Sequence, residues 1–289
     1  AKEWGVDFGD PTIDLDRLRN WKEGVLLKMS GGLTMLCKQR GVNYIHGCAA
    51  FKDSHTITVS GRDPLEFDHC ILATGSRPAL PKLFQEGGPR IMDSTAALTL
   101  TDIPQRLLVV GGGYIGLEMG SVYAALGSRV CVVEMTNELL PGVDRDLVRP
   151  LQGKLSKDFE AIRLSTLVTS VVAEENSVSV IMESGEETVE ETFDRILVSV
   201  GRTPNSDIIG LDNTKVELDE GGFVEVDEQQ KTTDSSILGI GDVVGGPMLA
   251  HKASHEARVA VDGLVGEETR PSNRTVPAVV FTDPEIAWC

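Results

Sequence analysis

The chain has 289 residues, of which 41% are hydrophobic and 25% are charged, a balance typical of a globular protein with room for two domains. Its 44 acidic and 27 basic residues give a net charge of −17, which repels nucleic acid and anionic lipid, so neither is expected as a partner. The longest apolar runs fall short of the roughly 18 residues that span a bilayer, and the opening AKEWGVDFGD lacks the features of an export signal.

The five cysteines are odd in number and show no close pairing motif, which indicates reduced thiols and a cytoplasmic location. Cys70 and Cys131 stand in apolar runs and are interpreted as small buried hydrophobic residues. Cys37 and Cys48 would form a redox pair only if the fold brought them together. The chain starts with alanine and stops at Cys289 inside a predicted strand, so we expect both ends to be cut.

In the first forty residues, apolar side chains recur at spacings of three, four and seven. With Asp14 as a possible N-cap and Gly41 as a stop, this pattern predicts one long or two consecutive amphipathic helices. The residues of the expected apolar face are Leu15, Leu18, Val25, Met29 and Leu36. Short strands are predicted within the segments VNYIHGCAAF, TITVSG and DHCILATGSRP, and a loop rich in glycine and proline follows them.

A complete strand-helix-strand unit begins after Pro104, with strands at 107–110 and 130–134 and a helix at 115–126. Its turn carries Gly-x-Gly-x-x-Gly, a phosphate-binding pattern. In this pattern Gly111 permits the tight turn, Gly113 lets the backbone approach a pyrophosphate, and Gly116 lets helix and strand pack closely. The helix N-terminus adds free N–H groups and a positive dipole end.

Glu134 ends the second strand of this unit, close to the offset of about 20 residues at which a carboxylate accepts hydrogen bonds from a ribose. A 2′-phosphate would be repelled there, and no arginine follows directly. The sequence therefore favours NAD(H) over NADP(H).

A second glycine turn ends a short apolar strand at 237–240, where Gly241 and Asp242 precede a helix expected near Met248. An aspartate in this place can hold a sugar or polyol hydroxyl, and the helix N-terminus can face a polar ring edge. A capped strand-to-helix turn without a ligand would be the simpler interpretation if this motif stood alone.

Four motifs, ILATGSRP, GGGYIGLE, VSVGRTPN and GIGDVVGGPMLAHKA, occur in the order and spacing seen in FAD-dependent pyridine nucleotide-disulfide oxidoreductases. The whole chain resembles this family, and the segment PMLAHKASHE is most similar to its dihydrolipoamide dehydrogenase branch. The resemblance implies a three-layer FAD/NAD(P)-binding α/β fold with an NAD domain inserted into a split FAD domain. It implies an FAD domain at 1–100 and 229–268, an NAD domain at 101–228 and the start of an interface domain at 269–289.

The resemblance also implies which residues contact the two cofactors. The residues expected along FAD are Gly47, Thr74, Gly75, Ser76, Asp242, Met248, Leu249, Ala250 and His251. The residues expected along NAD(H) are Gly111, Gly112, Gly113, Tyr114, Ile115, Gly116, Leu117, Glu118, Glu134, Val168 and Gly201, with Tyr114 and Glu118 where nicotinamide meets flavin. Arg202 and Asn205 belong to a family motif, and the sequence leaves open whether they do more than shape a turn.

The resemblance to the dihydrolipoamide dehydrogenase branch implies an activity that passes electrons from dihydrolipoamide through a redox disulfide and FAD to NAD+. The family's N-terminal FAD fingerprint, its Cys-x-x-x-x-Cys disulfide and its C-terminal His-Pro base do not occur in this chain, so we expect no turnover by it alone. The resemblance implies a homodimer and a partner that is the dihydrolipoamide-bearing domain of 2-oxoacid dehydrogenase complexes. The alternatives are another NADH-dependent flavin disulfide reductase or diaphorase, and a non-catalytic NAD(H)-binding module.

Two further features have simpler interpretations. His251 and His255 are four residues apart on a predicted helix, but no third ligand is evident, so no metal site is expected. The acidic run ESGEETVEETFD, which starts at Glu183, is interpreted as a solvated hairpin.

Overall fold

A five-stranded parallel sheet lies in the part of the chain that carries the first glycine turn. The computed structural model describes residues 4, 5, 7, 9, 11–85, 87–267 and 275–289. The chain divides into a first unit, Ala1–Ile45, Pro81–Gly142 and Gln152–Ser199, and a second unit, His46–Leu80, Val143–Leu151 and Val200–Cys289.

The domain boundaries expected from the sequence, after residues 100, 228 and 268, differ from these limits and stay a prediction. Residues 269–274 of the last expected domain lie outside the described residues.

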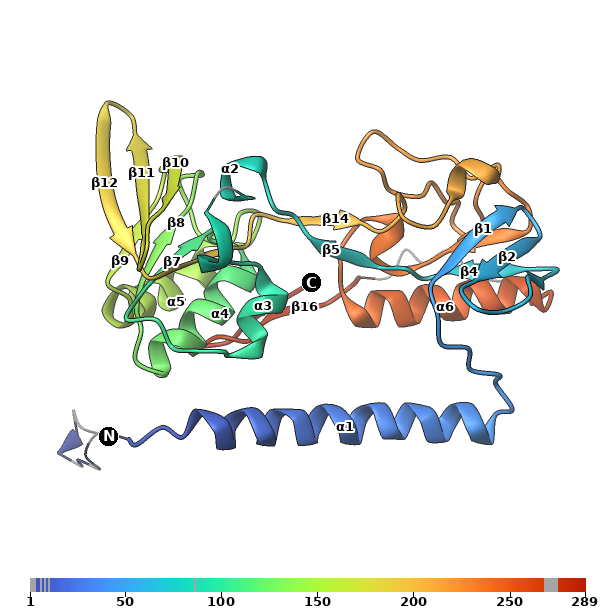
Figure 1. Cartoon of the computed structure of the whole chain (residues 1–289), viewed down its shortest axis with the longest axis horizontal. Coiled ribbons are helices and arrows are strands. Elements are labelled where there is room, and N and C mark those ends of the chain that lie inside the picture. The colour runs from blue at the N-terminus through green and yellow to red at the C-terminus, as the bar shows by residue number, and fades with distance from the viewer. Residues whose placement is uncertain (1–3, 6, 8, 10, 86, 268–274) are drawn as a thin grey trace. The chain divides into compact units, whose positions relative to one another are not determined.

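The parallel sheet of the first unit has the strand order β6-β13-β7-β8-β9. Strands β7, β8 and β9 of this sheet are labelled in Figure 1. Its strands are β6 (Ile91–Met92), β13 (Arg195–Val198), β7 (Arg106–Val110), β8 (Arg129–Val133) and β9 (Ala161–Arg163). Helix α4 (Tyr114–Ala125) connects β7 to β8 within one residue of its predicted bounds, α5 (Arg145–Asp158) precedes β9, and α3 (Ser94–Thr99) precedes β7. The predicted strand-helix-strand unit is confirmed.

A second, antiparallel sheet covers one face of the parallel sheet. It consists of β10 (Leu167–Ala173), β11 (Val178–Ser184) and β12 (Glu187–Phe193). Side chains alternate along a strand, so Leu108, Val110, Cys131 and Val133 face this second sheet and form one hydrophobic core with Val180 and other residues of it. Helix α4 packs against β7 and β8. The first unit therefore has three layers, and the predicted three-layer α/β fold is confirmed.

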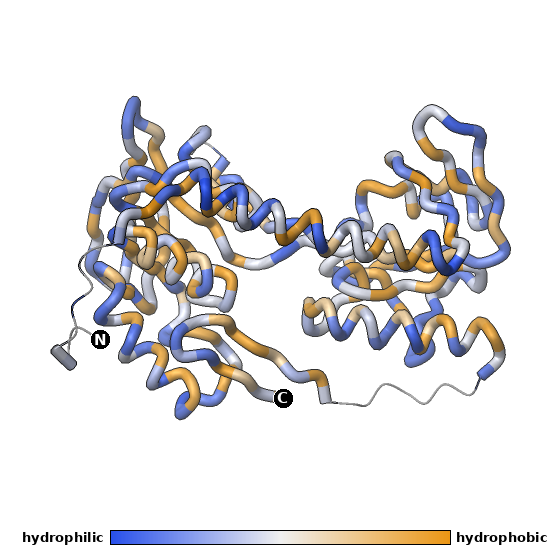
Figure 2. The backbone as a smooth tube through the Cα atoms, turned by 90° about the horizontal axis from the view of Figure 1, so that it is seen from below, coloured by the Kyte–Doolittle hydropathy of each residue, from blue (hydrophilic) through white to orange (hydrophobic). Residues whose placement is uncertain are grey.

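Helix α1 (Leu15–Gln39) forms as the apolar spacing predicts, with the Asp14 side chain accepting a hydrogen bond from the Arg17 N–H at its start. Gly41 follows its end with a φ of +67°, in the left-handed region that favours glycine. No residue of α1 is buried, and Trp21 is 70% exposed. Figure 2 shows hydrophobic residues recurring along this helix. Within the described residues the expected apolar face is thus largely uncovered.

The second unit is built from short strands. They are β1 (Ala49–Asp53), β2 (Thr56–Val59), β3 (Leu65–Glu66), β4 (Cys70–Leu72) and β5 (Ser76–Pro78), then β14 (Arg202–Pro204) and β15 (Ile237–Gly239). The first three form an antiparallel sheet, β15 pairs in parallel with β4, and β14 pairs antiparallel with β5. Segments far apart in sequence therefore meet here, and their core contains Phe51, Leu72, Ile237 and Val243.

The short helices are α2 (Lys82–Gln85), η2 (Gly88–Arg90), η3 (Leu211–Asn213) and η4 (Gly241–Val244). After η4 comes α6 (Ala250–Leu264), which begins two residues beyond Met248. The last strands, β16 (Ala278–Val280) and β17 (Ile286–Trp288), form an antiparallel hairpin, where the sequence predicted only a strand that runs to Cys289. Cys131 is buried as expected, but Cys70 is only half-buried. Burial raises the pKa of both thiols.

Candidate functional site

The first glycine turn has a backbone that only glycine accommodates. Gly111 has a φ of +108°, and a Cβ there would collide with the Ser199 carbonyl oxygen. A Cβ at Gly116 would collide with the Gly111 carbonyl oxygen and lie 2.6 Å from Ser199 Oγ. These two glycines therefore permit the close packing of the turn, the start of α4 and the segment after β13, as the fingerprint predicts.

Gly113 differs from its neighbours because it faces open space. It is the N-cap of α4, a Cβ there would meet no atom within 4 Å, and no side chain caps the helix. The first N–H groups of α4 therefore have no capping side chain, and among the described residues the space beside Gly113 is open. A pyrophosphate fits such a site because it accepts hydrogen bonds from these groups and gains from the helix dipole.

Glu134 follows β8 and is buried, with 7% of its surface exposed. Its Oε2 accepts a hydrogen bond from the Gly112 N–H at 2.7 Å, and its Oε1 accepts one from the Thr136 N–H at 2.8 Å. A carboxylate oxygen can accept more than one hydrogen bond, so ribose hydroxyls can still bind. The glycine turn and the acidic residue are therefore in direct contact, as a site for a ribose and its phosphate requires.

The remaining residues expected along NAD(H) fall in three environments. Gly112, Gly116 and Leu117 are buried, Ile115 and Glu118 are half-buried, and Tyr114 is exposed at the first position of α4. The Val168 side chain is buried in the core between the two sheets. Gly201 belongs to the second unit and has a φ of +130° with open space beside it. Their contacts with NAD(H) stay predictions.

The second unit brings together several residues expected along FAD. Ser76 Oγ donates a hydrogen bond to Asp242 Oδ2 at 2.6 Å and accepts one from Arg202 Nε at 2.6 Å. Within the described residues, Asp242 Oδ1 accepts no hydrogen bond, so it can receive one from a ligand hydroxyl. This unsatisfied oxygen beside a glycine turn fits a polyol such as the ribityl chain of a flavin.

Thr74 and Gly75 are held by Asn205. The Asn205 side chain donates a hydrogen bond to the Thr74 carbonyl oxygen at 2.9 Å, and its backbone N–H donates one to the Gly75 carbonyl oxygen at 3.0 Å. Asn205 and Arg202 thus shape the turns that carry the expected flavin contacts. Gly47 approaches Val59 closely, since a Cβ there would lie 2.6 Å from Val59 Cγ1.

The start of α6 carries the other expected flavin residues. Met248 and Leu249 are half-buried, and Ala250 and His251 are exposed. His251 Nε2 lies 2.6 Å from the Pro277 carbonyl oxygen, which can only accept a hydrogen bond. Among the described residues, no group of three or more His, Cys, Asp and Glu side chains is placed to hold a metal ion.

A buried ion pair that the sequence analysis missed holds the second glycine turn. Lys252 Nζ lies 2.9 Å from Glu256 Oε1, and the two side chains are 8% and 10% exposed. Lys252 also donates hydrogen bonds to the carbonyl oxygens of Gly241 and Gly245, and Glu256 Oε2 accepts the Gly241 N–H at 2.7 Å. Both charges are therefore satisfied by each other and by the loop that carries Asp242. Their spacing of four on a helix was the signal available in the sequence.

Cys37 and Cys48 are free thiols in the structure, and so is Cys289. No helix in the described part of the chain is both long and apolar enough to cross a membrane.

The structure has two glycine turns, each between a buried strand and a helix and each with an acidic residue beside it. This arrangement defines a nucleotide-binding α/β protein.

The family model described as pyridine nucleotide-disulphide oxidoreductase matches residues 8–257. Dihydrolipoyl dehydrogenase of Haemophilus influenzae is 42% identical over 292 residues, a match that covers 100% of this chain and 61% of the relative. The enzyme of the same name from Vibrio cholerae is 41% identical over 290 residues, with 99% and 61% covered.

Among solved structures, the HOCl-induced flavoprotein disulfide reductase RclA from Escherichia coli matches with a TM-score of 0.86 and 28% identity. The match covers 95% of this chain and 63% of RclA. The chain therefore belongs to the pyridine nucleotide-disulphide oxidoreductase family, a family of enzymes whose membership implies binding of FAD and NAD(H). It spans about three fifths of the length of the curated relatives named above.

Proposed function

We propose that this chain is the part of a dihydrolipoyl dehydrogenase that binds NAD(H) and part of the FAD. The observation that carries the proposal is the contact between the Gly112 N–H and Glu134, together with 42% identity to such an enzyme along the whole chain. In the full-length protein, the bound flavin and a redox disulfide would supply the electron transfer between dihydrolipoamide and NAD+.

The residues of this chain would bind and orient the two cofactors. In the first unit, the N–H groups at the start of α4 would hold the NAD pyrophosphate, and Glu134 would accept the hydroxyls of the adenosine ribose. Tyr114 and Glu118, on the first turns of the same helix, would lie toward the nicotinamide. Val168 and Gly201 would line the cofactor through their backbones.

In the second unit, Asp242 would accept a ribityl hydroxyl through its Oδ1, while Ser76 and Arg202 hold its other oxygen in place. The segment from Met248 to His251 would lie along the flavin, with the N-terminus of α6 toward the ring. Gly47, Thr74 and Gly75 would contact FAD through their backbones.

The same proposal covers the assembly, the location, the partner and the domain division of the protein. It includes a homodimer, a cytoplasmic location, and a dihydrolipoamide-bearing domain of a 2-oxoacid dehydrogenase complex as the partner. It also includes the division into FAD, NAD and interface domains expected from the sequence.

Calorimetric titration of the purified chain with NADH and with FAD tests the binding part of the proposal. Flavin absorbance read on the same samples shows whether FAD is retained. The proposal expects saturable NADH binding, and the absence of NADH binding by folded protein would contradict it. Binding of NADH without FAD would indicate that this chain alone binds NAD(H) but does not retain the flavin.

A second candidate is another flavin disulfide reductase, which the structural similarity to RclA favours. Reduction of NAD+ by dihydrolipoamide, measured with the full-length gene product, separates the two. We expect dihydrolipoamide-dependent turnover, whereas NADH oxidation by other acceptors without lipoamide turnover would favour the second candidate.

A further inference from the structure

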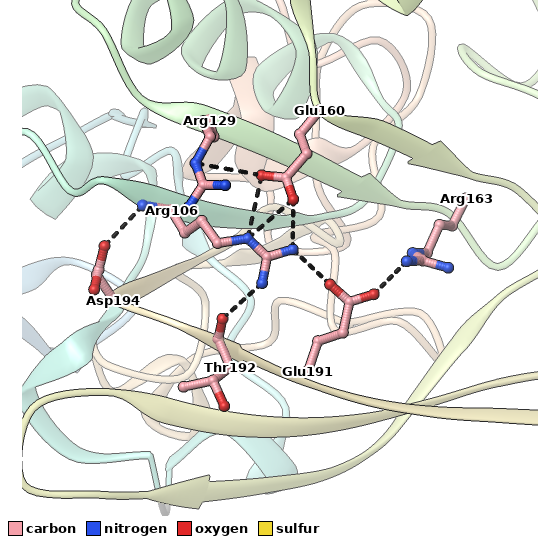
Figure 3. Close-up of polar contacts among 7 residues, drawn as sticks. All are labelled: Arg106, Arg129, Glu160, Arg163, Glu191, Thr192 and Asp194. Atoms are coloured by element: carbon pink, nitrogen blue, oxygen red, sulfur yellow. Dashed lines mark hydrogen bonds and ion pairs between the residues drawn. The ribbon is translucent and has the colours of Figure 1, made fainter.

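Five charged side chains of the first unit form a row of ion pairs in which positive and negative charges alternate (Figure 3). They follow the order Arg129, Glu160, Arg106, Glu191, Arg163. Arg106 Nη2 lies 2.6 Å from Glu160 Oε1 and 2.6 Å from Glu191 Oε2. The other oxygen of Glu191 pairs with Arg163. Glu191 therefore bridges two arginines, one through each carboxylate oxygen.

This bridge connects two sheets. Arg106 begins β7 in the parallel sheet, Arg163 ends β9 at the edge of the same sheet, and Glu191 lies on β12 of the covering sheet. Arg106 is fixed further by donating a hydrogen bond to the Thr192 carbonyl oxygen at 2.9 Å, and its guanidinium lies 4.7 Å from the centroid of the Phe193 ring. The well-held Arg106 thus anchors Glu191, and Glu191 anchors Arg163.

The bridge differs from an ordinary surface ion pair in its exposure. The side chain of Glu191 is 16% exposed, that of Arg106 is 23% exposed, and that of Arg163 is 34% exposed. Exposed pairs contribute little because water and salt screen them, whereas removing one partner of a pair shielded from water leaves a charge without compensation. Replacement of Glu191 by a neutral side chain would therefore leave Arg163 without its anion.

Arg163 is also the neighbour of Glu134. It pairs with Val133 at the ends of β9 and β8, and its carbonyl oxygen accepts the Glu134 N–H at 2.9 Å. Strand β9 has three residues and pairs only with β8 among the described strands. The residues after it hold the same segment, because the Thr166 N–H donates a hydrogen bond to the Glu134 carbonyl oxygen at 3.0 Å. The position of the Arg163 backbone therefore helps to fix the position of Glu134.

We propose that Glu191 is a positioning residue for NAD(H): through Arg163 it holds the end of β9 and thereby orients the Glu134 carboxylate toward the adenosine ribose. This inference rests on the proposed function, because it takes Glu134 to be the residue that binds the ribose. It assigns to Glu191, a residue of the acidic run that the sequence indicates only as a solvated hairpin, a role in positioning another residue of the cofactor site.

The test measures NADH affinity by calorimetry in the full-length gene product, with flavin content and thermal midpoint recorded for each variant. Glu191→Gln keeps the shape of the side chain and removes its charge. We expect NADH affinity to fall about 3-fold to 30-fold, the range found when residues linked to a site through a packed network are changed. Flavin content should stay unchanged. The control is Glu190→Gln, since Glu190 precedes it on β12 and accepts a hydrogen bond from Ser179 instead.

A double-variant comparison separates positioning from general loss of stability. In a Glu134→Gln background the charge that Glu191 orients is gone, so Glu191→Gln should cost little further NADH affinity. Equal losses in both backgrounds, or a lower thermal midpoint with unchanged NADH affinity, would overturn the inference. Arg163→Gln breaks the same contact from its other end and carries the test if Glu191→Gln does not fold. Failure of the unaltered protein to bind NADH would overturn the proposed function itself.

Discussion

Gly112 donates its backbone N–H to Glu134 Oε2 at 2.7 Å. This hydrogen bond joins the phosphate-binding turn to the carboxylate that follows the next strand. Because the Thr136 N–H occupies Oε1 at the same time, the carboxylate has a fixed orientation before any ligand is bound. The carboxylate is thus preorganised for the ribose contact proposed above, in which its negative charge would disfavour a 2′-phosphate.

Glu134→Arg should therefore weaken NADH binding much more than FAD binding. Loss of charge-assisted hydrogen bonds to the ribose predicts a decrease in NADH affinity of about 10-fold to 100-fold. Calorimetry on the full-length protein measures both cofactors. The matched control is Glu186→Arg, which makes the same charge change at an exposed position between β11 and β12. Equal losses for NADH and FAD would show that Glu134 does not belong to a separate NAD site.

Two glycines of the fingerprint should respond differently to alanine. Gly116→Ala places a methyl group against Gly111 and Ser199, so we expect the free energy of unfolding to fall by roughly 1–3 kcal/mol. Gly113→Ala meets open space at a φ of −76°, so stability should change by less than about 0.5 kcal/mol while NADH affinity falls. Urea unfolding and calorimetry measure the two effects. Full NADH affinity in Gly113→Ala would argue against close approach of a pyrophosphate.

Removing only the positive charge of the buried Lys252–Glu256 pair should lower the free energy of unfolding more than removing both charges. Lys252→Met leaves the Glu256 carboxylate buried without its cation, which costs about 3–5 kcal/mol. Adding Glu256→Gln removes that charge and keeps an acceptor for the Gly241 N–H, so the double variant should be more stable than Lys252→Met alone. Chemical denaturation gives the two free energies, and flavin absorbance reports the state of the Asp242 turn. A double variant no more stable than the single one would contradict this account.

Asp234, which is only 3% exposed, should make the second unit sensitive to acid. Burial opposes its ionisation, but hydrogen bonds from Ser54, Ser236 and the Lys215 N–H outweigh this and lower the pKa of Asp234 to about 2 from 3.8. A group with a depressed folded-state pKa contributes stability above its unfolded pKa and loses it as the pH falls through its folded pKa. The contribution of about 2 kcal/mol at neutral pH should fall by about 1 kcal/mol by pH 3.

The measurement compares urea unfolding of the natural protein and of Asp234→Asn between pH 6 and pH 3. The difference in stability between them should shrink as the pH falls. A difference that stays constant over this range would contradict the hydrogen-bonded arrangement around Asp234.

Local sequence patterns predicted the strand-helix-strand unit around the first glycine turn to within one residue. Helix α4 and strands β7 and β8 each have a strong period or an unbroken apolar run, and the glycine spacing determines the turn between them. A helix was also predicted in the first forty residues, but the sequence left open whether it is one helix or two, and the structure has the single helix α1. Its largely exposed apolar face was not predicted, because periodicity shows which residues form an apolar face but not what packs against it. The last hairpin was predicted only in part, because the sequence indicated a strand that runs to Cys289 but not its pairing with β16, and both strands are only three residues long.

The sequence by itself determined the strand-helix-strand unit, the acidic residue at its end and the second glycine turn, because each depends on residues close together in the chain. Only the tertiary structure decided the partners of those residues. The bridge from Glu191 to Arg163 spans 28 positions, and the contact between Ser76 and Asp242 spans 166. Such contacts depend on how sheets stack and which strands pair, so no local pattern encodes them. The charges of Glu191 and Lys252 were visible in the sequence, and so was the spacing of four between Lys252 and Glu256. The burial of that pair and the partners of Glu191 were not.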